Sequence, residues 1–326
     1  MKTKVRIVAA LLCGAGLAAL IALGRGRAPT ESSVAAAGSL SNQECRRCHQ
    51  AVWREWEESY HARAFNDDRV QAAFQHFGFD RQCQSCHAPE RQLNLEIDTP
   101  VVLRESEREM GVDCLSCHGL ADGGVAAVRD LPDAPCRPTL TTGFETSLAC
   151  GVCHDAIFKD WQASRYRTEG KHCQTCHMAP SGERGGRSHL CLGGHNDDLV
   201  RSGARLACRR EGDELVVSVT NHATGHNFPG ERHNRLLLVE VIEESAAGEV
   251  TLARQSLIKG ITPFRGESSA ERLQVDQTFQ DRYPIVARAA AAKVRLLYKP
   301  FPWYSDFDAL VVDEVVAEIA ATEKDE

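Results

Sequence analysis

The pattern Cys-x-x-Cys-His occurs five times and constrains this chain more than any other feature. We number the copies motifs I to V in chain order: Cys45, Cys48 and His49; Cys83, Cys86 and His87; Cys114, Cys117 and His118; Cys150, Cys153 and His154; Cys173, Cys176 and His177. Two thiols at this spacing can form thioethers with the two vinyl groups of one haem, and the following imidazole becomes the proximal iron ligand. The sequence therefore predicts five haem c groups.

Three other uses of paired cysteines fit the pattern less well. A structural zinc site takes four ligands from two pairs and does not require a histidine after each pair. Thioredoxin-like pairs occur singly in a βαβ context, which this sequence lacks. Disulfide bonds in an exported protein would leave the histidine after all five pairs as a coincidence.

The cysteines and histidines are concentrated in the first part of the chain. Twelve of the 14 Cys and nine of the 13 His lie between Cys45 and Cys191. Aromatic residues make up only 6% of the sequence, so we expect haem macrocycles to supply much of the hydrophobic core here. This predicts a mainly helical, haem-packed multihaem cytochrome c domain at residues 41–212.

After residue 212 the sequence changes to strand-like runs separated by turn residues. The runs are residues 214–220, 235–242, 249–253, 293–298 and 309–316. Alternation of apolar and polar residues indicates half-buried strands and predicts a small antiparallel β-sandwich at residues 213–326. As alternatives to strands, residues 289–292 and the last run, residues 309–316, could each form a helix. The expected fold class is thus α+β.

The N-terminal segment is typical of an exported protein. Basic residues precede an apolar run at residues 7–23, which predicts a signal peptide or N-terminal membrane anchor over residues 1–27. The run is close to the roughly 18-residue lower range for a spanning helix, while residues 35–37 offer a cleavage site. Residues 28–40 form a small-residue linker. We expect a periplasmic location, with the chain soluble or tethered to the inner membrane through residues 7–23.

An internal repeat relates residues 45–61 to residues 150–166. Each copy predicts an attachment site followed by a helix, with Trp56 and Trp161 at equivalent positions. If the first copy is helical up to His61, this residue lies roughly 18 Å from its own attachment site. His61 is therefore better placed to ligate another haem.

Several segments together resemble a known family. They are Trp56-x-x-Ser59-x-His61-Ala62, Gly111-Val112-x-Cys114-x-x-Cys117-His118-Gly119, Cys173-Gln-Thr-Cys176-His177-Met178-Ala-Pro180, Ser188-His189-x-x-x-Gly193-Gly194 and Asn221-x-x-x-Gly225-His226-x-x-Pro229-Gly230. Their ordered combination is similar to the cytochrome c-554-like multihaem family over residues 40–245. The resemblance implies a largely helical haem-stacking domain, export, and electron transfer between haems ligated mostly by two histidines.

Eight histidines remain as candidates for the distal haem ligands: His61, His76, His172, His189, His195, His222, His226 and His233. The resemblance favours His61, His189 and His226, each of which lies in a matched segment. His195 and His222 are second choices because they lie near such segments. We expect His76 to be a core residue. Ligation by two histidines would give lower reduction potentials than His/Met ligation.

Motif III departs from the family pattern. A histidine often follows the Cys-His-Gly sequence in such proteins, but none follows Gly119 closely here. We number each haem after its motif. The distal ligand of haem III must then come from elsewhere in the chain, or its iron has an open coordination position.

Three cysteines of the exported part lie outside the motifs: Cys136, Cys191 and Cys208. In an oxidising compartment, the simplest expectation is a disulfide between Cys191 and Cys208.

The charge and the motifs narrow the function. The formal net charge is -7 before any haem propionates are counted, which argues against nucleic acid and favours basic redox partner proteins. A quinol-linked membrane donor is one expected partner. We expect an electron carrier. One alternative is a multihaem oxidoreductase that acts on nitrite, hydroxylamine or nitric oxide at a five-coordinate haem. The other is a haem subunit of a larger complex or filament. Cys-x-x-Cys-Lys, a nitrite-reductase signature, is absent from the sequence.

Overall fold

The computed structural model describes residues 40–76, 78–181, 186–230, 235–262, 267–269, 272–286, 289–301 and 303–319. By contacts, the chain divides into two units, and the second, Ala37–Glu326, contains all of these residues. The expected export segment at residues 1–27, the linker up to residue 39, and His233 lie outside the described residues. Among the described residues, no helix is long and apolar enough to cross a membrane.

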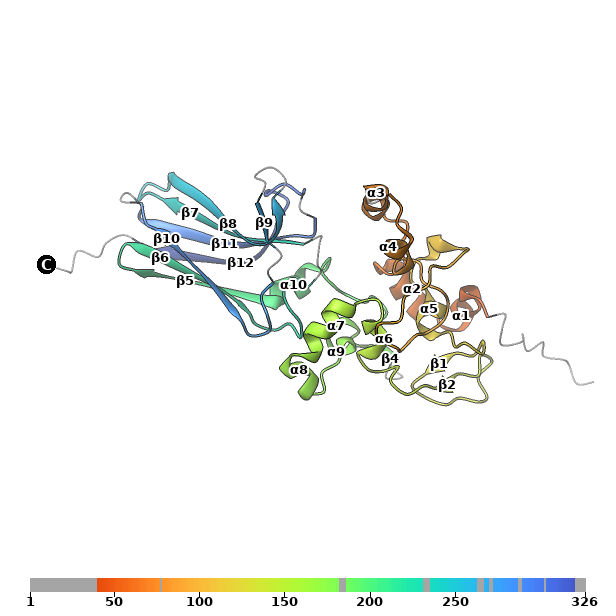
Figure 1. Cartoon of the computed structure of the whole chain (residues 1–326). Coiled ribbons are helices and arrows are strands. Elements are labelled where there is room, and N and C mark those ends of the chain that lie inside the picture. The colour runs from red at the N-terminus through yellow and green to blue at the C-terminus, as the bar shows by residue number, and fades with distance from the viewer. Residues whose placement is uncertain are drawn as a thin grey trace, which may run out of the picture. The chain divides into compact units, whose positions relative to one another are not determined.

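Short helices dominate the chain up to residue 203 (Figure 1). They are α1 (Asn42–Cys48), α2 (Gln50–Glu58), α3 (Asp68–His76), α4 (Arg81–Ser85), the 3-10 helix η2 (Arg108–Met110), α5 (Cys114–His118), α6 (Leu148–Gly151), α7 (Asp155–Gln162), α8 (Arg165–Thr168), α9 (Cys173–His177) and α10 (Asp197–Gly203). Two small strand pairs accompany them: β1 (Ala126–Ala127) with β2 (Thr139–Leu140), and β3 (Pro180–Ser181) with β4 (Gly186–Arg187). Most of these helices are far shorter than the roughly 12 residues at which isolated helices become marginally stable, so tertiary packing must hold them.

The internal repeat is visible in the backbone. His49 and His154 each precede a helix, α2 and α7, with nearly the same dihedral angles (φ -108, ψ 48 and φ -103, ψ 48). The indole N–H of Trp56 donates to the carbonyl of Val112, and that of Trp161 to the carbonyl of Lys171, both at 2.8 Å. Helix α2 ends at Glu58, so the expected helix up to His61 is wrong in its last turn.

Two antiparallel sheets form the rest of the chain (Figure 1). The first has the order β10-β6-β5 and the second β12-β11-β7-β8-β9. The bounds are β5 (Ala204–Glu211), β6 (Glu214–Asn221), β7 (Leu236–Glu244), β8 (Val250–Thr262), β9 (Glu267–Ser269), β10 (Thr278–Pro284), β11 (Ala291–Lys299) and β12 (Leu310–Glu318). Buried side chains from both sheets share one core, including Leu206, Val217, Val239 and Leu296. The α+β class with an antiparallel β-domain is confirmed.

The sheets differ from the sequence prediction in their edges. Strand β5 begins at Ala204, so the first sheet starts before the expected boundary after residue 212. Strands β9 and β10 were also not predicted. Exposed arginines on β5 and exposed polar residues on β10 interrupt the apolar pattern, because each strand lies at an edge of the first sheet. The last run is a strand, β12, and not a helix.

The two parts are packed differently. The β-domain has a large continuous core, whereas Phe158, Trp161 and Tyr166 form a small buried cluster among the helices. This contrast agrees with the expectation that macrocycles supply much of the core around the helices.

Candidate haem sites

Motifs III and V place their three side chains by helical geometry. Helix α5 spans motif III from Cys114 to His118, and α9 spans motif V from Cys173 to His177. Positions i, i+3 and i+4 lie on one face of a helix. One helical turn therefore directs both thiols and the imidazole to the same side, as attachment to a single macrocycle requires.

Backbone carbonyls orient the proximal imidazoles. The Nδ1 atom of His87 lies 2.6 Å from the carbonyl oxygen of Ala64, and that of His118 lies 3.0 Å from Ala126. The Nδ1 atom of His177 lies 2.5 Å from the carbonyl oxygen of Leu192. A hydrogen bond donated by Nδ1 fixes the tautomer and leaves Nε2 as the nitrogen for a metal.

Three proximal imidazoles face a second imidazole. The ring centroids of His118 and His189 are 6.2 Å apart, with 21° between the ring planes. Those of His177 and His226 are 6.2 Å apart at 17°, and those of His61 and His154 are 6.3 Å apart at 38°.

These spacings test whether a haem iron fits between the rings. With metal–nitrogen bonds of about 2.0 Å on both sides, two imidazoles on one metal have centroids about 6 Å apart. The three observed separations match this value, and two of the pairs are nearly parallel. The residues present therefore fit haem iron held by two histidines at motifs III, IV and V.

Burial lowers the pKa values of five of the six paired imidazoles and so favours their neutral form. Burial, and next the nearby His154, lower the pKa of His61 to about 4. Burial is also the largest cause of the lowered pKa values of His118, His177, His189 and His226. A neutral imidazole is the form that binds a metal, so the fold presents these rings ready for ligation.

Side chains of other residues hold the main chains of His189 and His226, in one case from far away in the sequence. Glu55 on α2 accepts a hydrogen bond from the backbone N–H of His189 at 2.8 Å. The carbonyl of His226 accepts from the Asn221 amide at 3.0 Å and from the Thr224 hydroxyl at 2.6 Å. Asn221 belongs to the same matched segment as His226, whereas Glu55 and Thr224 carry no motif of their own, and the sequence analysis missed the holding role of all three.

The loop of residues 221–230 is also tied to helix α7. The carboxylate of Asp160 accepts from the Asn227 amide at 3.0 Å and from the Arg272 guanidinium at 2.6 Å. Arg272 also donates to the carbonyl of Gly230 at 2.8 Å. An ion pair with little exposure thus joins the β-domain loop that carries His226 to the helix that follows motif IV.

Motif thiols from different motifs lie within hydrogen-bonding reach of one another. The thiol pairs are Cys45 with Cys114, Cys86 with Cys153, and Cys150 with Cys173. These contacts bring motif I next to motif III, motif II next to motif IV, and motif IV next to motif V.

The second-choice ligands lie elsewhere. The ring of His195 stacks on Tyr60 with centroids 3.9 Å apart, and its Nε2 lies 3.4 Å from a guanidinium nitrogen of Arg235. The Nε2 atom of His195 therefore faces a cationic group, which disfavours a metal ion at this nitrogen. His222 is exposed, and so is His76, which was expected to be a core residue.

Of the two alternatives for motif III, a ligand from elsewhere in the chain agrees with this geometry better than an open position. No nearby histidine follows motif III, but His189 reaches it from a segment beyond motif V. The sequence signal was the Ser188-His189 segment, which by itself did not indicate the motif that His189 faces.

The expected disulfide between Cys191 and Cys208 is wrong, since both cysteines are unbridged. Cys208 lies on β5 opposite Val217. Burial, and next the charge of Glu55, raise the pKa of Cys191 to about 11 in the helical part. The two thiols therefore belong to differently built parts of the chain.

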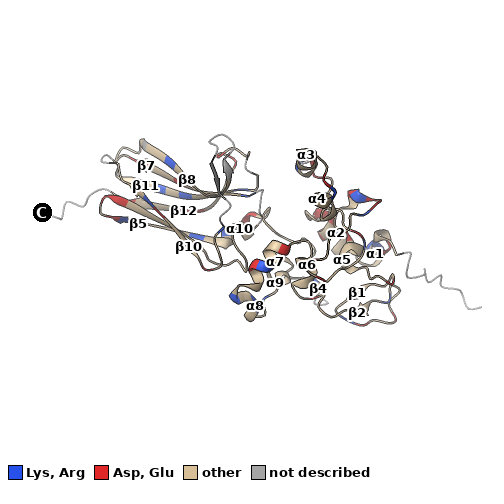
Figure 2. Cartoon of the chain, in the orientation of Figure 1, with Lys and Arg blue, Asp and Glu red and all other residues tan. Residues whose placement is uncertain are grey.

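Acidic and basic residues are both scattered over the helices and strands (Figure 2). No described helix or strand is coloured by one sign of charge alone over its whole length. The acidic balance of the chain is therefore spread over many elements.

Comparisons with known proteins identify a family model and solved structures that this chain resembles. Residues 44–119 match the family model described as cytochrome c554 and c-prime. The structure is similar to that of a penta-heme cytochrome c552 from Thermochromatium tepidum, with a TM-score of 0.67 and 18% identity, covering 87% of this chain and 100% of that chain. No curated protein matches.

Two other solved structures match only weakly. The first is Northeast Structural Genomics Consortium target SoR45, with a TM-score of 0.23 and 10% identity, covering 39% of this chain and 95% of that chain. The second is the hypothetical protein PH1083 from Pyrococcus horikoshii OT3, with a TM-score of 0.20 and 12% identity, covering 35% of this chain and 84% of that chain.

Proposed function

We propose, from the premise that this chain is a multihaem c-type cytochrome of the cytochrome c554 family, that it transfers electrons along five haem c groups. Motifs I to V would hold the haems, and each bound haem supplies a one-electron Fe(III)/Fe(II) couple. The protein's own contribution is to fix the axial ligands, exclude water and keep neighbouring sites close.

The observation that carries this proposal is the set of three imidazole pairs. His61 with His154, His118 with His189, and His177 with His226 would occupy both axial positions of haems IV, III and V. An iron with two fixed protein ligands changes its oxidation state without binding a substrate. The arrangement therefore favours electron transfer over catalysis at these sites.

The thiol contacts support a continuous path. Thioether sulfurs sit at the edge of the macrocycle, so thiols in contact place two haem edges close together. Contacts link motif I to III, II to IV, and IV to V. The side chains of Cys117 and Cys150 also lie close enough to influence each other's ionisation, which brings motif III near motif IV. All five sites thus belong to one connected set.

The partners follow from charge and location. A formal charge of -7, with haem propionates in addition, favours basic redox proteins that approach by electrostatic attraction. The N-terminal segment at residues 1–27 supports a periplasmic location, soluble or tethered to the inner membrane. A quinol-linked membrane protein is then a suitable electron donor.

The enzyme alternative had its basis in a vacant position at haem III. The pairing of His118 with His189 argues against that vacancy. We therefore propose an electron carrier, with low reduction potentials as ligation by two histidines implies.

Electron paramagnetic resonance of the fully oxidised holoprotein tests this function. We expect five covalent haems by mass spectrometry and low-spin ferric signals for haems III, IV and V. High-spin signals from these three haems, assigned with alanine variants of the distal histidines, would contradict the proposal. A denatured protein without covalent haem would contradict it entirely.

A further inference from the structure

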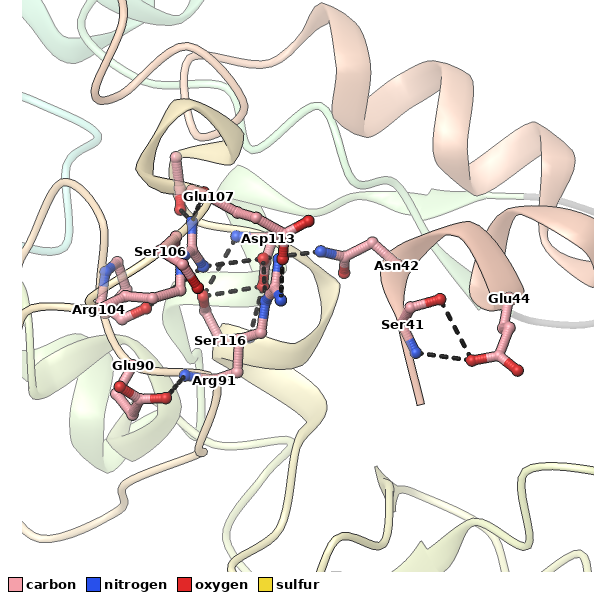
Figure 3. A network of polar contacts seen from close by, with 12 residues as sticks. Ser41, Asn42, Glu44, Glu90, Arg91, Arg104, Ser106, Glu107, Asp113 and Ser116 are labelled. Carbon is pink, nitrogen blue, oxygen red and sulfur yellow. Dashed lines mark hydrogen bonds and ion pairs between the residues drawn. The ribbon is translucent and has the colours of Figure 1, made fainter. Parts of the chain in front are cut away.

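A fully buried carboxylate lies directly before motif III (Figure 3). One oxygen of Asp113 accepts hydrogen bonds from the Asn42 amide at 2.7 Å and from the guanidinium groups of Arg91 and Arg104, each at 2.8 Å. The other oxygen accepts from the backbone N–H of Ser116 at 2.9 Å. This carboxylate thus joins α1, which carries motif I, to α5, which carries motif III.

The charges in this network depend on one another. Burial acts to raise the pKa of Asp113, but the hydrogen bond from Arg91 and the charge of Arg104 outweigh it and leave the pKa lowered. The Arg104 side chain is only 3% exposed. Removing the carboxylate charge would leave a buried guanidinium without its counter-ion, which is strongly unfavourable.

Arg104 links the Asp113 carboxylate to residues 104–112, a segment that we call the strap. Its guanidinium donates to the carbonyl oxygens of Ser106 at 3.1 Å, Glu107 at 2.7 Å and Gly111 at 3.0 Å. These groups lie along the strap, so Arg104 fixes its conformation from within. Asp113 in turn fixes the guanidinium.

The strap holds the main chain of His61. The backbone N–H of Val112 donates to the carbonyl of His61 at 2.9 Å. A Cβ atom at Gly111 would lie 2.3 Å from the same carbonyl oxygen and 2.8 Å from that of Ala62, so the strap approaches this segment as closely as glycine allows. Trp56 adds a hydrogen bond from its indole N–H to the Val112 carbonyl at 2.8 Å.

We propose that Asp113 is a positioning residue for His61 and thus for the sixth ligand of haem IV, although it directly precedes the attachment site of haem III. This inference rests on the proposed ligation of haem IV by His61 and His154. Metal ligands must be held within about 0.5 Å of their productive position. The path from Asp113 through Arg104 and the strap supplies that support.

Asp113→Asn tests the proposal because it keeps the shape of the side chain and removes its charge. We expect one high-spin ferric haem per chain that is absent from the parent, and one additional carbon monoxide bound per chain after reduction. Asp122→Asn is the matched control, since this exposed carboxylate follows the same motif and accepts from the backbone of Gly124. The control should keep the parent spectrum.

Gly111→Ala acts on the same path without altering the carboxylate. The added Cβ must displace the His61 carbonyl, so this variant should give the same high-spin haem. It also separates the positioning role from a folding defect, because it leaves the buried ion pairs intact. A low-spin spectrum of folded Gly111→Ala holoprotein would contradict the role of the strap.

Double variants identify the haem affected. Asp113→Asn combined with His61→Ala should show no more high-spin haem than His61→Ala alone, whereas its combination with His189→Ala should show two. Additive signals with His61→Ala would overturn the positioning role. A low-spin His61→Ala protein would instead overturn the ligation of haem IV and this inference with it, so the two failures are distinguishable.

Discussion

The rings of His118 and His189 lie nearly parallel, with centroids 6.2 Å apart. His189 is held through its backbone N–H by Glu55 on the helix that follows motif I. In the same way, the main chain of His61 is held by the strap before motif III. The proposed distal ligand of one haem is thus held by residues next to the attachment site of another, so we expect the sites to stabilise one another.

Replacing His189 by alanine should open one coordination position. We expect one high-spin ferric haem, assigned to motif III, and one carbon monoxide bound per chain in the reduced protein. His222→Ala is the control because His222 is exposed and belongs to no ring pair in the described part of the chain. An unchanged resonance spectrum of His189→Ala would show that another residue ligates haem III.

Asp160→Asn should loosen the loop that carries His226. The side chains of Asp160 and Arg272 are only 12% and 17% exposed, and breaking a buried pair by removing one partner costs about 3 kcal/mol. We expect a lower thermal midpoint of the holoprotein and partial high-spin character at haem V. Lys159→Gln, the neighbouring change on α7, breaks exposed pairs and should leave both unchanged.

The motifs could be predicted from the sequence because their chemistry is local. The five attachment sites need only spacing within one helical turn, and the segments around His61, His189 and His226 match a family pattern. The structure places these three histidines opposite proximal imidazoles, while ligation itself stays a prediction. The haem that each one faces could not be predicted, because it depends on how the chain returns on itself.

The supporting residues illustrate the same limit. Glu55, Asp113 and Asp160 are ordinary acidic residues in the sequence, and their roles come from hydrogen bonds to segments far along the chain. Strand β5 was missed for a related reason. Its exposed arginines interrupt the apolar pattern, so these residues were assigned to the helical domain; in the structure β6 pairs with β5, and β12 packs against it.

Acidification should destabilise the holoprotein partly through His195. Burial, and next the positive charge of Arg235, lower the pKa of this imidazole to about 4. The unfolded chain binds the proton near pH 6.5, so folding stability should fall as the pH decreases from about 6.5 to 4 and level off below. The contribution of neutral His195 to folding stability is fully present above pH 6.5.

His195→Gln checks this assignment. Glutamine keeps an acceptor for Arg235 but does not titrate, so the thermal midpoint of the variant should fall less between pH 7.5 and 4.5 than that of the parent. His222→Gln, at an exposed site, should retain the parent's pH dependence. The same pH dependence in His195→Gln and the parent would rule out His195 as the responsible group.

Producing the chain without haem attachment should separate its two parts. Among the described residues, the helices have one small hydrophobic cluster of their own, around Trp161, whereas both sheets share a large core. Without macrocycles the helices cannot bury enough apolar surface to offset the entropy of folding, while the sandwich can. We expect circular dichroism with strand signal but little helix, and limited proteolysis that leaves a fragment starting near Ala204. Equal protease resistance of the helical part with and without haem would contradict the view that haem builds its core.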